Sequence, residues 1–149
     1  MAIARGAGTE IIRSAHFEEV DSTVSKLIVG VQHHIYTVLS IIMNCRSANT
    51  AGNDCIVELL GYDSKAGTTA RTIELFRWDM RNAQAFTWND KFSFNGFEPI
   101  NFTGPMDDAT KQDAIADQGS SVAQILQCRT GEAADNVDVY ITYIDQNNA

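Results

Sequence analysis

The segment "VDVYITYIDQNNA" (residues 137–149) contains the pattern that decides the fold class. Every second residue from Val137 to Tyr143 is apolar, and Asp138 and Thr142 are among the residues between them. Successive side chains of a strand point to opposite faces, so this alternation predicts a strand with one face on a hydrophobic core. We predict that the following residues face that core, together with Ile125 or its neighbours: Val137, Val139, Ile141 and Tyr143.

Similar strand signals recur along most of the chain, separated by short polar or glycine-containing segments. The strand candidates are "KLIVGVQ" (26–32), "HIYTVLSIIMNCRS" (34–47), "CIVELLGYD" (55–63), "TIELFRWDM" (72–80), "AFTWNDKFSF" (85–94) and "VAQILQCR" (122–129). We predict two hairpins, one joining 34–47 to 55–63 and the other joining 122–129 to the final strand, because turn-forming residues separate each pair. The segment "TEIIRSAHFEEV" (9–20) is predicted to be an edge strand or part of an extended arm.

These elements predict an all-β protein, an antiparallel β-sandwich of the jelly-roll or Greek-key type. A chain of 149 residues is the size of one domain, so we expect a single domain with an extended N-terminal arm over about residues 1–10. One long excursion, Asn95 to Ser121, interrupts the strand pattern, and its part "DDATKQDAIADQGSS" (107–121) predicts a short helix.

Composition and charge exclude several classes of protein. The net charge of −8 disfavours nucleic acid as a partner, because binding to phosphates depends on clustered Lys and Arg. No stretch reaches the roughly 18 apolar residues of a membrane helix, and no apolar secretory segment follows the N-terminus. We therefore expect a protein made in the cytoplasm, with no membrane partner.

The cysteines Cys45, Cys55 and Cys128 form an odd set without CxxC spacing. This pattern predicts reduced thiols, at least two of them buried, that act as small apolar groups. A Cys45–Cys55 bridge across the predicted hairpin is the alternative.

The sequence lacks the common signatures of catalysis and metal binding. It contains no GxSxG, HExxH or GxxxxGK[ST] motif, and its acidic cluster of Asp107, Asp108, Asp113 and Asp117 lacks EF-hand spacing. Adjacent residues of a strand face opposite sides, so His33 and His34 do not share one site if that segment is extended. We predict no enzyme activity, no metal and no cofactor. The alternative of a small cytoplasmic enzyme requires His16 or His34 in a deep pocket with a carboxylate.

Aromatic residues concentrate between residues 78 and 102, where a carbohydrate platform is conceivable. The set comprises Trp78, Trp88, Phe92, Phe94, Phe97 and Phe102, and we expect most of these rings to lie in the core. Phe97 and Phe102 belong to the excursion and are the expected exposed members, better suited to anchoring a protein interface than to binding sugar.

The chain resembles the β-sandwich structural proteins of tailed-phage virions. The resemblance covers residues 25–95 and 121–146 and rests on "HHIYTVLSIIMNCRSANTAGNDCIVELLGYD" (33–63) and "VAQILQCRTGEAADNVDVYITYIDQ" (122–146). It implies a capsid cement (decoration) protein that binds the major capsid protein on the outer surface of the virion, as a homotrimer. Tail, connector or fibre-base components and receptor- or carbohydrate-binding modules are the alternatives.

For the cement protein, we expect attachment through the N-terminal arm and the excursion. The predicted protein-interface residues are Arg5, Arg13, Phe97, Phe102 and Met106. The two arginines are among the few cations on an acidic chain, and the three apolar residues lie in a segment without the periodicity of a core element.

Overall fold

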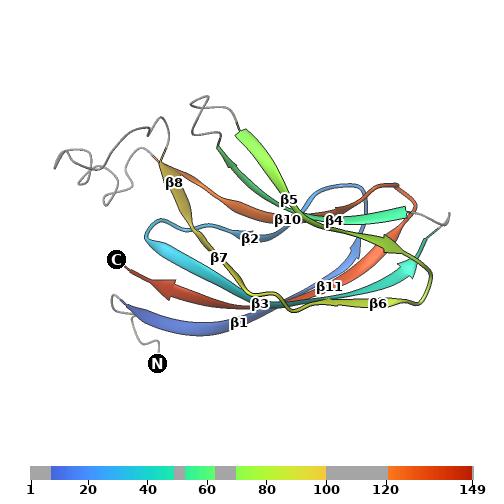
Figure 1. Cartoon of the computed structure of the whole chain (residues 1–149), viewed down its shortest axis with the longest axis horizontal. Helices are drawn as coiled ribbons and strands as arrows, with labels where there is room; N and C mark the ends of the chain where they lie inside the picture. The colour runs from blue at the N-terminus through green and yellow to red at the C-terminus, as the bar shows by residue number, and fades with distance from the viewer. Residues whose placement is uncertain (1–7, 49–52, 63–69, 100–120, 149) are drawn as a thin grey trace.

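The computed structural model describes residues 8–48, 53–62, 70–99 and 121–148 (Figure 1). Within these ranges it contains β-strands and no helix. The strands are β1 (Thr9–Val20), β2 (Ser25–Val29), β3 (His34–Ser47), β4 (Asn53–Tyr62), β5 (Ala70–Met80), β6 (Ala85–Trp88), β7 (Phe92–Asn95), β8 (Phe97–Pro99), β9 (Ser121–Ala123), β10 (Ile125–Thr130) and β11 (Asn136–Asn147). The all-β prediction is confirmed. The helix predicted over 107–121 lies outside the described residues, except that Ser121 begins β9.

The strands form two antiparallel sheets that face each other (Figure 1). One sheet has five strands in the order β1-β11-β3-β6, with β7 also paired to β3, and the other has four in the order β2-β10-β4-β5. Buried side chains from both sheets form one hydrophobic cluster between them. The short pair β8-β9 stands apart from both sheets and holds together the two ends of the excursion.

Both predicted hairpins are wrong. Strand β3 pairs with β11 and strand β4 pairs with β10, so each supposed hairpin crosses from one sheet to the other. A polar turn between two half-buried strands does not reveal whether the chain folds back within its own sheet or passes to the facing one. The choice depends on pairing partners far away in the sequence.

The register of the last strand is confirmed, since its predicted core residues are all buried: Val137, Val139, Ile141 and Tyr143. On the facing sheet, Leu126 is fully buried, whereas Ile125 is only half-buried. The predicted strand 85–94 is divided into β6 and β7, which both pair with β3. Its rings Trp88, Phe92 and Phe94 nevertheless all pack against the core, as expected.

Two glycines allow three chain segments to cross at one end of the molecule. The Gly30 N–H donates to the Gln124 carbonyl, the Gln124 N–H donates to the Gly96 carbonyl, and the Gly96 N–H donates to the His34 carbonyl. A Cβ on Gly30 would lie 1.9 Å from the Gly96 oxygen, and a Cβ on Gly96 would lie 2.1 Å from the Val31 oxygen. Only glycine fits such a close backbone approach. This junction ties the base of the excursion to both sheets.

Candidate functional site

The outer surface of the five-stranded sheet is the candidate functional site. Along β11 the buried residues alternate with residues that point away from the core, and the register places these beside outward residues of β1 and β3. Tyr140 lies between His16 and Ile42, Thr142 between Ser14 and Ser40, and Ile144 between Ile12 and Thr37. Thr87 of β6 and Ser93 of β7 extend the rows beyond β3. We call these residues the apolar–hydroxyl face.

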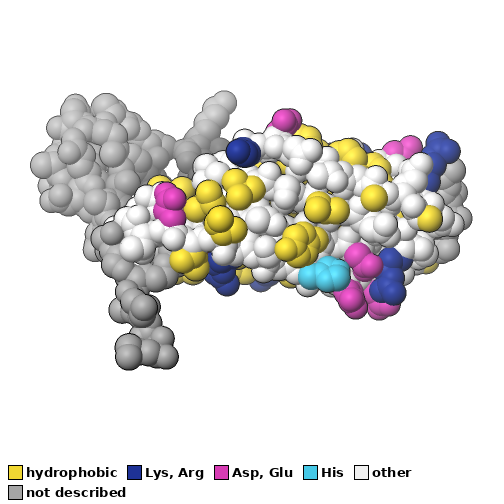
Figure 2. Space-filling view, turned by 90° about the horizontal axis from the view of Figure 1, so that it is seen from below, with side chains coloured by type: hydrophobic (Ala, Val, Ile, Leu, Met, Phe, Trp, Pro, Cys, Tyr) yellow, Lys and Arg dark blue, Asp and Glu magenta, His cyan; other side chains and the backbone are white. Residues whose placement is uncertain are grey.

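Hydroxyl groups and isoleucines share this face. Ile12 is 72% exposed, and Ile42 and Tyr140 are each 41% exposed. The hydroxyls bond to one another across strands, with 2.9 Å between Thr37 Oγ1 and Ser93 Oγ. Figure 2 shows hydrophobic side chains spread across the middle of this face. The four-stranded sheet also exposes apolar side chains, Val29 and Ile73. On the five-stranded sheet Ile12, Ile42 and Tyr140 lie on one uncharged surface, and a contiguous apolar patch is typical of an interaction surface.

Charged side chains border the apolar–hydroxyl face and do not enter it. Residues opposite each other on neighbouring strands form a row across the sheet. Between the row that contains Glu10 and the row that contains Asp138, none of the described outward strand positions carries Lys, Arg, Asp or Glu. At the Asp138 end, Arg46 lies 3.2 Å from a Glu19 oxygen and 3.6 Å from an Asp138 oxygen. Figure 2 shows basic and acidic side chains gathered beside a histidine. The face therefore has an uncharged centre with charges at its ends.

The opposite surface, on the outside of the four-stranded sheet, is built from ion pairs. Arg77 of β5 contacts Asp54 at 2.7 Å and Glu74 at 2.8 Å. Glu58 of β4 accepts a hydrogen bond from Gln127 Nε2 at 2.7 Å and lies 3.5 Å from Arg129. Hydrogen bonds from Arg77 lower the pKa of Glu74 and raise that of Arg77 itself. We call these residues the ion-paired face: Asp54, Glu58, Glu74, Arg77, Gln127 and Arg129.

Arg13, a predicted attachment residue, contacts other side chains of the same chain. Its Nη1 lies 3.3 Å from Asp145 Oδ2, and its guanidinium stands 5.7 Å from the centre of the Tyr143 ring. Asp145 is 2% exposed, and its other oxygen lies 2.6 Å from His34 Nδ1. This pairing stabilises the buried Asp145 carboxylate, because a buried charge without a partner is strongly destabilising. Half of the Arg13 side chain remains exposed, so its role in attachment stays a prediction.

His34 meets one of the two conditions of the enzyme alternative, since a carboxylate lies beside it. Its ring stacks on Tyr36 with 6.1 Å between centroids, and Asp145 is shared with Arg13. Burial is the main cause that raises the pKa of Tyr36, to about 12, and the Asp145 carboxylate adds to it. The Tyr36 oxygen accepts a hydrogen bond from the Val31 N–H at 3.1 Å. The group resembles an internal ion pair closing one end of the core.

The remaining predicted interface residues are placed only in part. Phe97 begins β8 at the glycine junction and is half-buried, whereas Arg5, Phe102 and Met106 lie outside the described residues. Most of the aromatic set packs inward, as expected. Trp78 and Trp88 rest against the core, and Trp88 stacks on Phe76 with 4.5 Å between centroids.

All three cysteines are free and buried, which confirms the thiol prediction. The alternative bridge between Cys45 and Cys55 is not present, and the hairpin that motivated it does not exist, because the two residues lie in different sheets. Within the described ranges no group of His, Cys, Asp and Glu is arranged to hold a metal ion. In that same part of the chain, no helix is long and apolar enough to cross a membrane.

The apolar–hydroxyl face was missed in the sequence. Its signal was present in the middle of β1 and β11, where the outward positions are Ile12, Ser14 and His16 in one strand and Tyr140, Thr142 and Ile144 in the other. What the sequence did not reveal is that β1, β11 and β3 lie side by side, which turns three separate patterns into one surface.

No family model and no curated protein matches the sequence. Among solved structures, a chain from the Bacillus endospore appendages, described as a novel family of disulfide-linked pili, aligns with 100% of this chain and 97% of its own length. The alignment has a TM-score of 0.42 and 12% sequence identity. A likeness of this degree identifies neither a family nor a function.

Proposed function

We propose that this protein is a non-enzymatic structural protein of a tailed-phage virion, a capsid cement protein that binds the outer surface of the major capsid protein and stabilises the shell. The observation that carries this proposal is the apolar–hydroxyl face. It offers a broad contact surface without charge at its centre, on a rigid two-layered scaffold.

The distribution of charge on the face is that of a protein interface. The cores of protein interfaces are depleted of charged residues, and their rims are polar and accessible to solvent. The isoleucines, Tyr140 and the hydroxyls occupy the centre here, and the cluster around Arg46 lies at one end. On a chain with a net charge of −8, such a face can approach a large protein surface without repulsion between like charges.

The order of the strands supports the proposal at the level of fold. We infer a jelly roll, because consecutive strands are distributed between two four-membered paths, β1-β11-β3-β6 and β2-β10-β4-β5, in which the first and last long strands are neighbours. Jelly rolls occur in viral capsid proteins and also in lectins. The fold is therefore consistent with a capsid role and does not decide it. The function has to be argued from the surface of the molecule.

A cement protein acts through many copies, so modest contacts of each copy add up on the assembled shell. We propose a homotrimer whose attachment elements are the N-terminal residues including Arg5, the excursion with Phe97, Phe102 and Met106, and the apolar–hydroxyl face. Arg13 then serves mainly to hold the buried Asp145 in place at the edge of the same sheet.

The test compares one lysine on each face. Thr142→Lys places a charge at the centre of the apolar–hydroxyl face, and Thr72→Lys places the same charge on an exposed outward position of the four-stranded sheet. Each purified variant is added to particles prepared without the protein, and the bound copies are counted by mass spectrometry. The temperature at which the particles release their genome is then recorded. We expect Thr142→Lys to lower the affinity at least about tenfold and Thr72→Lys to leave it unchanged.

Different outcomes separate the alternatives. Wild-type occupancy by Thr142→Lys would reject this face as the attachment surface. Full binding without any effect on particle stability would reject cementing. A number of copies per particle that corresponds to one ring of subunits, instead of to the whole capsid shell, would favour a tail or connector component. Light scattering of the free protein tests the trimer, and a monomer at all concentrations and on the particle would reject it.

A further inference from the structure

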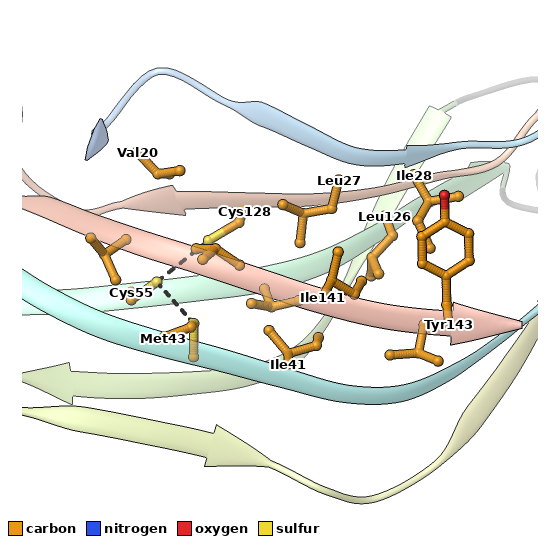
Figure 3. Close-up of a cluster of buried hydrophobic side chains, with 14 of the residues drawn as sticks. Val20, Leu27, Ile28, Ile41, Met43, Cys55, Leu126, Cys128, Ile141 and Tyr143 are labelled. Carbon is orange, nitrogen blue, oxygen red and sulfur yellow. Dashed lines mark hydrogen bonds between the residues drawn. The ribbon is translucent and has the colours of Figure 1, made fainter. Parts of the chain in front are cut away.

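Sulfur atoms gather in one part of the core. Cys55 Sγ lies 3.4 Å from Cys128 Sγ and 3.7 Å from Met43 Sδ, and all three residues are fully buried. Figure 3 shows the Cys55 sulfur between the other two, which come from β10 and β3. Packing alone accounts for buried sulfur, but an oxidant can also join two thiols in direct contact as a disulfide.

The two cysteines belong to neighbouring strands of one sheet. In the antiparallel pair of β10 and β4, Cys128 is opposite Val57 and Thr130 is opposite Cys55, so the cysteines are diagonal neighbours on the inner side. A bulge or irregularity lies close to each: between Leu126 and Gln127 toward β2, and between Val57 and Glu58 toward β5. Bulges bend a strand and increase its local twist, so the backbone near both cysteines departs from regular pairing.

We propose that Cys55 and Cys128 form a reversible intramolecular disulfide when the chain folds or opens in an oxidising medium, and that Cys45 remains a free thiol. A disulfide bond is about 2.05 Å long, so the sulfurs have to approach each other by about 1.4 Å from their present contact. The bond would join residues 73 positions apart in the sequence.

The closed core keeps the pair reduced. Attack on a disulfide requires a thiolate, and both the hydrogen bond with Cys55 and burial raise the pKa of Cys128 well above its ordinary value. A bulky oxidant also has no access to fully buried sulfur. Oxidation is therefore confined to molecules that are folding or transiently open.

With glutathione disulfide as the oxidant, the exchange proceeds in two steps. One cysteine thiolate attacks a glutathione sulfur, forms a mixed disulfide and releases one glutathione thiolate. The second cysteine thiolate then attacks the protein sulfur of the mixed disulfide, which forms the Sγ–Sγ bond and releases the second glutathione. The two thiol protons pass to the two glutathiones, so the protein loses two electrons and glutathione disulfide gains them.

The full chain is unfolded in denaturant and refolded either with reduced glutathione alone or with an excess of glutathione disulfide. We expect the second sample to lose the mass of two hydrogens and to yield a linked pair of peptides containing Cys55 and Cys128. Because the cross-link restricts the unfolded chain, the oxidised form should melt at least about 5 °C higher than the reduced form.

Three alanine variants make the assignment specific. Cys45→Ala should still form the link, whereas Cys55→Ala and Cys128→Ala should not, and near-ultraviolet circular dichroism verifies that each variant is folded. A link that involves Cys45 would overturn the proposal. So would natively folded wild-type protein without any link at excess oxidant, or an oxidised form less stable than the reduced one.

Discussion

The two outer faces of the molecule present polar atoms in different ways. On the ion-paired face, charged side chains bond to one another, as Arg77 does with Asp54 and Glu74. On the apolar–hydroxyl face, short hydroxyl side chains bond across strands beside exposed isoleucines, with 3.4 Å between Ser14 Oγ and Thr142 Oγ1. Both surfaces are formed by the outward positions of antiparallel strands around the same core.

This difference indicates which side is suited to a partner. A charged network has to lose water and keep its pairs when it is covered, which makes its burial expensive. Short hydroxyl and aliphatic side chains lose less conformational entropy than Arg or Glu when they are covered, and hydroxyls that bond to one another keep these partners. The apolar–hydroxyl face is therefore the one that a protein surface covers at the lower cost.

The largest expected effect comes from substitutions at the crossing of chain segments around Gly30 and Gly96. Because this crossing is bonded to both sheets, its disruption should unfold both outer faces together. Gly30→Ala and Gly96→Ala each force a Cβ against backbone oxygen, so we expect a loss of more than about 4 kcal/mol in the free energy of unfolding. Gly131→Ala is the matched control, because its Cβ would meet its nearest atom at 3.8 Å. Urea unfolding measures all three variants. A folded Gly30→Ala protein of normal stability would show that the junction is not needed.

A smaller loss is expected from a substitution in the buried part of the ion-paired face. Glu58→Ala removes the acceptor of the buried Gln127 amide and should reduce the unfolding free energy by about 1–3 kcal/mol. The double variant Glu58→Ala with Gln127→Leu should recover part of that loss, since the buried amide donor is removed together with its acceptor. Glu10→Ala, at the exposed end of the other face, should change stability by less than about 0.5 kcal/mol. Equal effects of Glu58→Ala and Glu10→Ala would remove this contrast between the faces.

An alkaline titration probes the core behind the apolar–hydroxyl face. The pKa of Tyr36 is raised to about 12 by burial, so ionisation favours the unfolded chain, whose tyrosines titrate near pH 10. The stabilising contribution is complete below pH 10 and is lost as the pH rises to about 12, and the loss in the free energy of unfolding is roughly 3 kcal/mol. Burial raises the pKa of Tyr143 as well, in the same direction.

Urea unfolding across this pH range provides the measurement. Tyr36→Phe should flatten the alkaline decline, while at neutral pH it loses the hydrogen bond from Val31. Tyr140→Phe, on the outer face, is the control and should keep the decline. An unchanged decline in Tyr36→Phe would assign the effect to other groups.

The smallest expected effect concerns acid and the exposed ion pairs. Hydrogen bonds from Arg77 lower the pKa of Glu74, so their contribution is present above the ordinary pKa of a glutamate and is lost as the pH falls through the lowered value. Arg77→Ala should weaken this acid dependence and leave neutral stability nearly unchanged, because exposed pairs contribute little. Thermal melting between neutral and acidic pH, at low and high salt, measures the effect. Arg71→Ala, which removes a guanidinium bonded to the Ala70 carbonyl, is the control.

Part of the fold was predictable because strand periodicity is local. The inward residues of β11 follow from alternation alone, and the bounds of β3 agree with the predicted segment 34–47. The hairpin predictions failed because the turns around residues 48–53 and 130–136 look alike whether the chain stays in one sheet or crosses to the other. Arg13 looked like a free cation because its partner, Asp145, is 132 residues away in the sequence.

By itself the sequence determined that the protein is all-β, that Val137, Val139 and Ile141 share an inward side, and that the thiols belong to the interior. Those properties follow from the two-residue period of a strand and from the low cost of burying small apolar groups. Only the tertiary structure decided that β11 lies between β1 and β3, that Cys55 contacts Cys128, and that one outer face is free of charge at its centre. Each of these depends on which strands pair, and pairing is set by contacts between segments that no local pattern relates.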